Sequence, residues 1–242
     1  MKLLQCNYET IEIPEKKWNY DSEIIGIDIP VVAVMGIGQN VQKFDLQLYL
    51  RSRFIDKGYK VSQIGTKKIS GLFGLHPLPD FLFNTQYSDV DKVYAFNRVM
   101  KDVSMQEKPD VILLGIPDSL LPLNNKHRFS FGLYAYEIFN AVQPDFVITS
   151  LMANDGYNDE FYSEISKMAK YKYNVNIDAY FVSQFCPLSN SIWSEKLSYV
   201  YLPRMELPKT EYKVYTTSDL NNDILFKQAE KKLLLYGKYE QY

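Results

Sequence analysis

Short apolar runs rich in β-branched residues alternate with amphipathic stretches along most of this chain. The first run, residues 29–35, is continuous, as expected of a parallel strand that is buried on both faces. A glycine-containing turn and a helical pattern over 43–57 follow, and Gly58 ends that pattern as a C-cap glycine. Residues 59–66 then predict a second strand, which completes a βαβ unit. This rhythm confines the chain to a parallel sheet covered by helices.

The same alternation continues to residue 185. Further helices are expected at 88–107, 132–142 and 159–171, and further strands at 109–119, 144–155 and 174–185. The loop over 67–83 is rich in glycine and proline and is long enough to indicate a functional role. The predicted fold class is therefore α/β, with a doubly wound, mostly parallel sheet of about five or more strands, flanking helices and a C-terminal helix.

The predicted domain organisation has three parts: an N-terminal lead-in over 1–28, a P-loop-like α/β domain over 29–200, and an extended segment with a C-terminal helix over 201–242. That helix is expected to begin at Ser218 as N-cap and to end at Gly237. Its inward-facing residues are expected to be Leu220, Ile224, Leu225, Ala229 and Leu233. Such a helix usually closes the flank of the sheet, and docking of a partner is the alternative.

Charge and composition exclude several classes of partner. The net charge is −2 and no basic stripe is present, so neither nucleic acid nor an anionic membrane surface is expected as a partner. No apolar run reaches the roughly 18 residues of a membrane span, and the N-terminus lacks the apolar core of a signal peptide. The two cysteines, Cys6 and Cys186, do not have metal-ligand spacing. They are expected to be reduced thiols in a cytoplasmic protein.

The turn after the first strand, GIGQNVQK over 36–43, has the main elements of a phosphate-binding loop. In the usual pattern, G-x-x-x-x-G-K-[ST], consecutive backbone N–H groups surround an anion at a helix N-terminus and the lysine adds a positive charge. In this pattern the first glycine lies six residues before the lysine. Here Gly36 lies seven residues and Gly38 five residues before Lys43, so neither has the usual spacing. A buried strand before the turn and a helix after it still meet the physical requirements.

Two residues depart from the pattern. Gln42 stands where a glycine is expected, and Phe44 stands where a serine or threonine would hold magnesium. Neither change forbids anion binding, but both disfavour efficient NTP hydrolysis. The candidate phosphate-binding residues are Gly36, Gly38, Gln39, Asn40, Val41, Gln42, Lys43 and Phe44. The alternative is an ordinary turn between strand and helix, with the lysine solvated.

Other candidate residues lie where predicted strands end. Ligands of open α/β sheets bind beyond the carboxyl ends of the strands, which makes Thr66, Asp118 and Asp155 a candidate strand-end site. Their more common role is that of loop or cap residues. His76 and His127 have no second histidine or cysteine at ligand spacing, so no metal site is predicted. A hydrolase triad has no anchor because the G-x-S-x-G pattern is absent, and no catalytic residue is assigned.

The segment 29–66, together with LFGLHPLPD over 72–80, resembles P-loop NTPases of the SIMIBI class, which includes dethiobiotin-synthetase-like and MobB-like proteins. It resembles still more a small bacterial family of peptide-maturation proteins that accompany radical SAM maturases of ribosomally made, modified peptides. The resemblance spans 28–185 and includes GLYAYEIFNAVQPD over 132–145. The matching signature residues are Gly36, Gly38, Lys43, Phe44, Gln47, Leu48, Leu50 and Arg51. In this family, phenylalanine after the lysine is the rule.

The resemblance implies an accessory protein of peptide natural-product maturation that binds ATP or GTP and acts as a switch or assembly factor. It leaves the role of magnesium open, and any enzymatic activity would be that of a weak P-loop NTPase. The implied partner is a peptide precursor or a peptide-modifying enzyme, and a homodimer is compatible with it. The alternative is a non-catalytic NTPase-fold module that has lost nucleotide and presents the 66–84 loop or the C-terminal helix to such a partner. A small-molecule ligase or kinase is disfavoured by the missing hydroxyl after the lysine.

Overall fold

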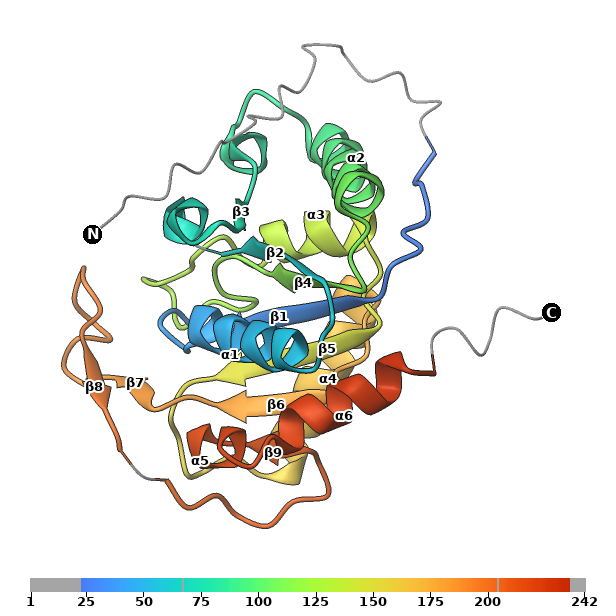
Figure 1. Ribbon diagram of the computed structural model, residues 1–242. Coiled ribbons are helices and arrows are strands. Elements are labelled where there is room, and N and C mark those ends of the chain that lie inside the picture. Colours follow the sequence, from blue (N-terminus) through green and yellow to red (C-terminus); the bar gives the residue numbers. More distant parts are fainter. Residues whose placement is uncertain (1–22, 67, 204, 236–242) are drawn as a thin grey trace, which may run out of the picture.

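Parallel strands form the main sheet, as the sequence predicts. The structure is a computed structural model that describes residues 23–66, 68–203 and 205–235. The strand order within these residues is β3-β2-β4-β1-β5-β6-β9, and every neighbouring pair is parallel (Figure 1). The strands are β1 (Val31–Ile37), β2 (Val61–Gly65), β3 (His76–Pro77), β4 (Val111–Gly115), β5 (Phe146–Leu151), β6 (Ala179–Val182) and β9 (Val214–Tyr215). The predicted α/β fold class is therefore confirmed.

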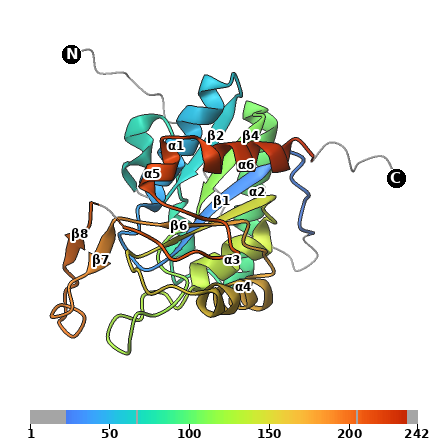
Figure 2. The same ribbon diagram turned by 90° about the horizontal axis from the view of Figure 1, so that it is seen from below.

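Helices cover both faces of this sheet. They are α1 (Lys43–Asp56), α2 (Asp89–Glu107), α3 (Leu133–Ala141), α4 (Asp159–Tyr173), α5 (Thr217–Leu220) and α6 (Ile224–Leu233), with 3-10 turns η1 (Lys68–Phe73) and η2 (Asp80–Phe83). Figure 2 shows α1 and α6 on one side of the sheet and α3 and α4 on the other. None of the helices in the described ranges is both long and apolar enough to cross a membrane.

Strand β1 lies at the centre of the sheet and contributes to the core on both faces. Val32 and Val34 pack beneath α1 and α6, while Ala33 and Met35 pack beneath α2 and α3. All four residues are buried. The continuous apolar run in the sequence therefore reflects a strand that has no solvent-facing side.

Two polar signature residues of α1 anchor this helix to β2. The side-chain amide of Gln47 donates to the carbonyl of Ile64 at 3.2 Å, and Arg51 Nη1 donates to the carbonyl of Val61 at 2.8 Å. Buried carbonyl groups require such partners. These two signature positions therefore set the place of α1 on the sheet and with it the start of the helix.

The C-terminal helix differs from the prediction. It is divided into α5 and α6, because Asp223 adopts a left-handed conformation with φ of 57°. The N-cap is Thr216, not Ser218, and Asp219 completes a capping box with it. Ile224 is exposed, whereas Phe226 is buried against Phe54. The predicted end at Gly237 lies outside the described residues.

Two other segments also depart from the sequence-based expectation. The glycine- and proline-rich loop over 67–83 contains η1, η2 and the short strand β3, which extends the sheet by one strand. The strand predicted over 174–185 is shorter, and the chain continues into β7 (Phe185–Pro187), which pairs antiparallel with β8 (Tyr199–Tyr201). This β7–β8 hairpin projects from the same end of the sheet as the β1–α1 loop (Figures 1 and 2).

The predicted lead-in over 1–28 lies mostly outside the described residues. The part that is described is held by Asn97 of α2, which accepts from the backbone N–H of Ile25 and donates to its carbonyl, both at 2.9 Å. The chain therefore reaches β1 along the α2 side of the sheet.

Helices α2 and α3 are joined by a buried ion pair that allows a test of the packing between them. Lys92 Nζ lies 3.1 Å from Glu137 Oε1, and the two residues are 8% and 2% exposed. Burial raises the pKa of the Glu137 carboxyl, and the neighbouring ammonium of Lys92 opposes that rise. Removal of one partner would therefore leave the other as an unpaired buried charge, which lowers the free energy of unfolding.

We expect Lys92→Met to lower the free energy of unfolding by about 3–5 kcal/mol, because it leaves a buried carboxylate without its partner. The double variant Lys92→Met/Glu137→Met should lose much less. Urea unfolding of both variants measures the difference. Lys167→Met, which removes the exposed pair with Glu164, is the control and should leave stability nearly unchanged. Equal losses in the single and double variants would contradict this account.

Candidate phosphate-binding site

The β1–α1 loop combines several left-handed residues within a short distance. Gly38, Asn40 and Gln42 have φ of 108°, 54° and 56°. Glycine is required at position 38, because a Cβ there would be strained at this φ and would lie 3.0 Å from the side chain of Met152. Successive backbone turns of this kind direct N–H groups toward a common anion-sized space.

The N-terminus of α1 faces this loop without a side-chain cap. Gln42 occupies the N-cap position, and its carbonyl accepts from Leu46 N at 3.0 Å. Its side chain is directed elsewhere, because Oε1 accepts from the backbone N–H of Gln184 at 2.7 Å. The side chain that replaces the expected glycine therefore connects the loop to the chain before β7 and leaves the first turn of α1 uncapped.

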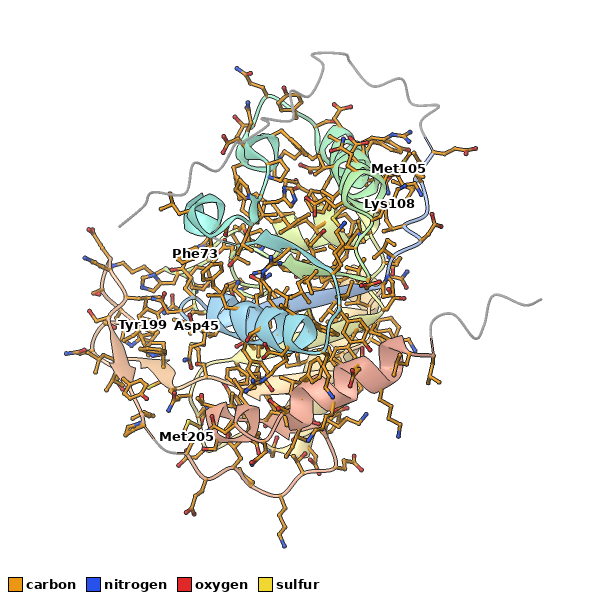
Figure 3. The ribbon with its side chains drawn as sticks, viewed as in Figure 1. Asp45, Phe73, Met105, Lys108, Tyr199 and Met205 are labelled. Atoms are coloured by element: carbon orange, nitrogen blue, oxygen red, sulfur yellow. The ribbon has the colours of Figure 1, made fainter. Side chains whose placement is uncertain are left out.

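A pocket of about 300 Å³ opens at this helix end. It is lined by Asn40, Val41, Gln42, Lys43, Phe44, Asp45, Thr66, Phe185 and Tyr199. Figure 3 shows Asp45 and Tyr199 near each other on this side of the molecule. The structure thus brings most of the candidate loop together with Thr66 from the end of β2.

Lys43 is held by the main chain that follows β4. Its Nζ donates to the carbonyls of Ile116, at 3.1 Å, and Asp118. Burial lowers the pKa of Lys43 to about 8, against the opposing effect of the Asp118 carboxylate. The ammonium of Lys43 is therefore held by the main chain and not surrounded by solvent.

The residues at positions 116–120, here called the 116–120 segment, also bind the loop itself. The backbone N–H of Gly38 donates to Ser119 Oγ at 2.7 Å, and the N–H of Leu120 donates to the carbonyl of Gly36 at 3.0 Å. Lysine and loop N–H groups are the anion-binding elements of such a site. In this structure they are partly satisfied by the protein's own oxygen atoms.

The candidate strand-end residues do not form one group. Thr66 lines the pocket, whereas Asp118 does not. The Asp118 carboxylate accepts from Ser130 N through Oδ2 at 2.7 Å and from Gln39 Nε2 through Oδ1 at 3.4 Å. Asp155 is exposed in the turn after β5 and does not line the pocket. Phe185 and Tyr199 line it without having been predicted, because no local pattern indicates where a hairpin far along the chain will fold back.

The position after Lys43 does not fit a magnesium ligand. Phe44 is only 7% exposed, and its ring lies 6.1 Å from the ring of Phe73. A Cβ on Gly65 would lie 3.3 Å from this phenylalanine ring. The phenylalanine thus fills the space between α1, β2 and η1 with carbon, where the usual loop supplies an oxygen ligand.

The end of β4 does not fit a magnesium ligand either. The strand ends at Gly115, where P-loop NTPases place an aspartate. A Cβ at Gly115 would lie 2.5 Å from Nε2 of Gln47, so the buried glutamine occupies the space of that side chain. Asp45 is the one carboxylate among the pocket residues, and it is exposed. Among the described residues, no group of three or more acidic, histidine or cysteine side chains could hold a metal ion.

The parallel sheet and the glycine loop between β1 and α1 define an α/β protein of P-loop NTPase-like fold. No protein-family model matches the chain, and no curated protein matches it significantly.

Similar solved structures include cobyrinic acid a,c-diamide synthase from Mycobacterium smegmatis, which was solved with bound ADP and magnesium. It has 15% identity and a TM-score of 0.47, and the match covers 88% of this chain and 97% of that one. A DUF1611 family protein from Anabaena variabilis has 15% identity and a TM-score of 0.47, over 69% of this chain. The chain spans 50% of the length of that protein. A MobB homolog from Bacillus stearothermophilus has 12% identity and a TM-score of 0.36, covering 84% of this chain and 97% of that one.

Proposed function

We propose that this chain binds the phosphate groups of a nucleotide, ATP or GTP or their diphosphates, at the β1–α1 loop and acts in the cytoplasm as a switch or assembly factor. The observation that supports this most directly is the uncapped N-terminus of α1, which opens into a pocket of about 300 Å³ beside Lys43. The helix dipole at this N-terminus and the positive charge of the lysine together favour an anion. Gln42 stands where a glycine is expected, and its side chain does not cap this helix end.

Rapid hydrolysis of the nucleotide is not expected. P-loop enzymes neutralise the charge that develops on the transferred phosphoryl group with a metal held by the loop hydroxyl and an aspartate. Phe44 and Gly115 supply neither oxygen ligand. Binding without efficient turnover is the consequence.

Competition for Lys43 explains how binding would produce a switch. In the protein alone, the carbonyls of Ile116 and Asp118 accept from the Lys43 ammonium, and the Ser119 hydroxyl accepts from the Gly38 N–H. The oxygens of a bound phosphate would require the same donors. A ligand that takes these donors releases the segment. The Asp118 carboxylate, through the N–H of Ser130, couples that release to the loop before α3.

A second candidate function is a binding module that no longer takes nucleotide. The observation in its favour is that η1 places Leu72 and Phe73 on the surface beside Phe44, where they are exposed. The hydrogen bonds of Gly38 N–H to Ser119 and of Lys43 to Asp118 are consistent with this function as well, because the protein itself satisfies these donors. This module would present the η1 surface to a peptide or a protein.

The proposed role in peptide maturation rests on the sequence signature of the β1–α1 segment. The partner would be a precursor peptide or the enzyme that modifies it. Co-purification of the tagged full chain with a precursor and a radical SAM maturase encoded beside its gene, with and without nucleotide, tests this role. Failure to retain either component would contradict the role in peptide maturation and leave the nucleotide site to be judged separately.

Nucleotide binding predicts a shift in thermal unfolding. A ligand at 100 times its dissociation constant should stabilise the protein by about 2.7 kcal/mol. We expect ADP, ATP or GTP to raise the unfolding temperature of the wild type and of Lys57→Ala, a matched control at the other end of α1. Lys43→Ala should lose most of the shift. No shift with any nucleotide would favour the binding module, and a shift unchanged by Lys43→Ala would place the site elsewhere.

The switch predicts a change in backbone protection. Addition of a binding nucleotide should accelerate hydrogen–deuterium exchange at the N–H groups of Leu120 and Ser130, because the 116–120 segment loses its contacts with the loop. Lys43→Ala should accelerate the same exchange without ligand, and strand β5 serves as the unaffected reference. Slower or unchanged exchange in the segment would contradict the switch.

Lys43 predicts a pH dependence of binding. Only its protonated form attracts an anion, and its pKa of about 8 places the loss of that charge well below the usual range of lysine. The contribution of this charge to ADP affinity should therefore change little below pH 7, and the affinity should fall by about tenfold between pH 7 and pH 9. Lys43→Arg, which keeps its charge, should show a flat profile over this range. A flat profile in the wild type would contradict the role of this lysine.

A further inference from the structure

The site as described contains strong elements for binding an anion and poor elements for binding a metal. We propose, on the basis of the proposed function, that the ligand of this loop is a metal-free phosphate ester or diphosphate rather than a nucleoside triphosphate–magnesium complex. Two packed positions and the balance of charge around the pocket support this assignment.

Phe44 is the first of these positions. The usual serine or threonine contributes its hydroxyl to the coordination sphere of magnesium. The Phe44 side chain is instead part of the packing between α1 and η1, with Phe73 against its ring. A hydrated magnesium ion requires six oxygen ligands at close range, and a buried aromatic ring excludes them from this side of the phosphate.

Gln47 is the second position. It fills the space above Gly115 and hydrogen-bonds the carbonyl of Ile64, so it is fixed in place by the same contact that anchors α1 to β2. An acidic side chain at the end of β4 would collide with it. Phe44 and Gln47 thus exclude metal ligands through the packing of α1 on the sheet. A change in the conformation of one loop would not remove this exclusion.

The charges near the loop match a ligand of modest negative charge. Lys43 supplies one positive charge, and a helix N-terminus is equivalent to about half a charge more. A phosphate monoester carries about −1.5 to −2 at neutral pH, which these two groups nearly balance. A diphosphate exceeds this balance and a metal-free triphosphate exceeds it further, and the carboxylates of Asp45 and Asp118 near the site would repel the larger excess more.

Magnesium should therefore not assist binding, and it should compete with the protein for the phosphate oxygens. Calorimetric titration of the full chain with ADP, ATP and inorganic pyrophosphate, each in excess magnesium and in EDTA at matched ionic strength, tests this directly. We expect magnesium to leave each affinity unchanged within about twofold or to weaken it, and we expect ADP and pyrophosphate to bind at least as tightly as ATP. Tightening by magnesium beyond about twofold would overturn the proposal.

A pair of variants identifies the cause. Phe44→Ser and Phe44→Leu both remove the aromatic ring, but only the serine adds the missing hydroxyl. The serine variant should gain a response to magnesium that the leucine variant lacks, and equal responses would overturn the role assigned to Phe44. Absence of binding of all three probes in both conditions would contradict the proposed function itself. Binding that requires magnesium would contradict only this inference.

Discussion

The hydrogen bonds from Lys43 to the main chain beyond β4 are the contact on which the site depends. They connect the first turn of α1 to the carbonyls of Ile116 and Asp118. The loop N–H of Gly38 joins the same neighbour through Ser119. Because these donors already have oxygen partners in the protein, an anion that took them would displace the carbonyls and the hydroxyl of this segment. The proposed switch rests on this exchange of partners.

The same helix that carries Lys43 also limits the chemistry. Its inner face places Phe44 against η1 and Gln47 over Gly115, and Arg51 completes the contact with β2. These residues serve the packing of α1 on the sheet. The consequence for the site is that carbon and amide groups occupy the two places where oxygen ligands would hold a metal. The packing of α1 on the sheet thus places carbon and amide groups, and no oxygen ligand, at Phe44 and Gly115.

Local pattern predicted most of the architecture. The predicted runs at 29–35 and 109–119 contain β1 and β4, whose residues are apolar or glycine without interruption. Ser88 begins α2 as an N-cap that accepts from Asp91 N. Prediction failed where long-range contacts decide the outcome. The break between α5 and α6 follows from a left-handed residue, Asp223, whose side chain lies 2.6 Å from Arg53 of α1. No spacing within the C-terminal segment reports such a partner.

The sequence by itself determined that a buried strand, a glycine loop and a lysine-bearing helix follow one another, and that Phe44 stands where a metal ligand is expected. These are properties of neighbours along the chain, and periodicity and spacing report them. Only the tertiary structure decided that Lys43 is held by the segment after β4, that Gln47 fills the space of a missing acid, and that the β7–β8 hairpin lines the pocket. Each of these results from the packing of residues that are far apart in sequence, and its energy depends on groups that meet only in the folded protein.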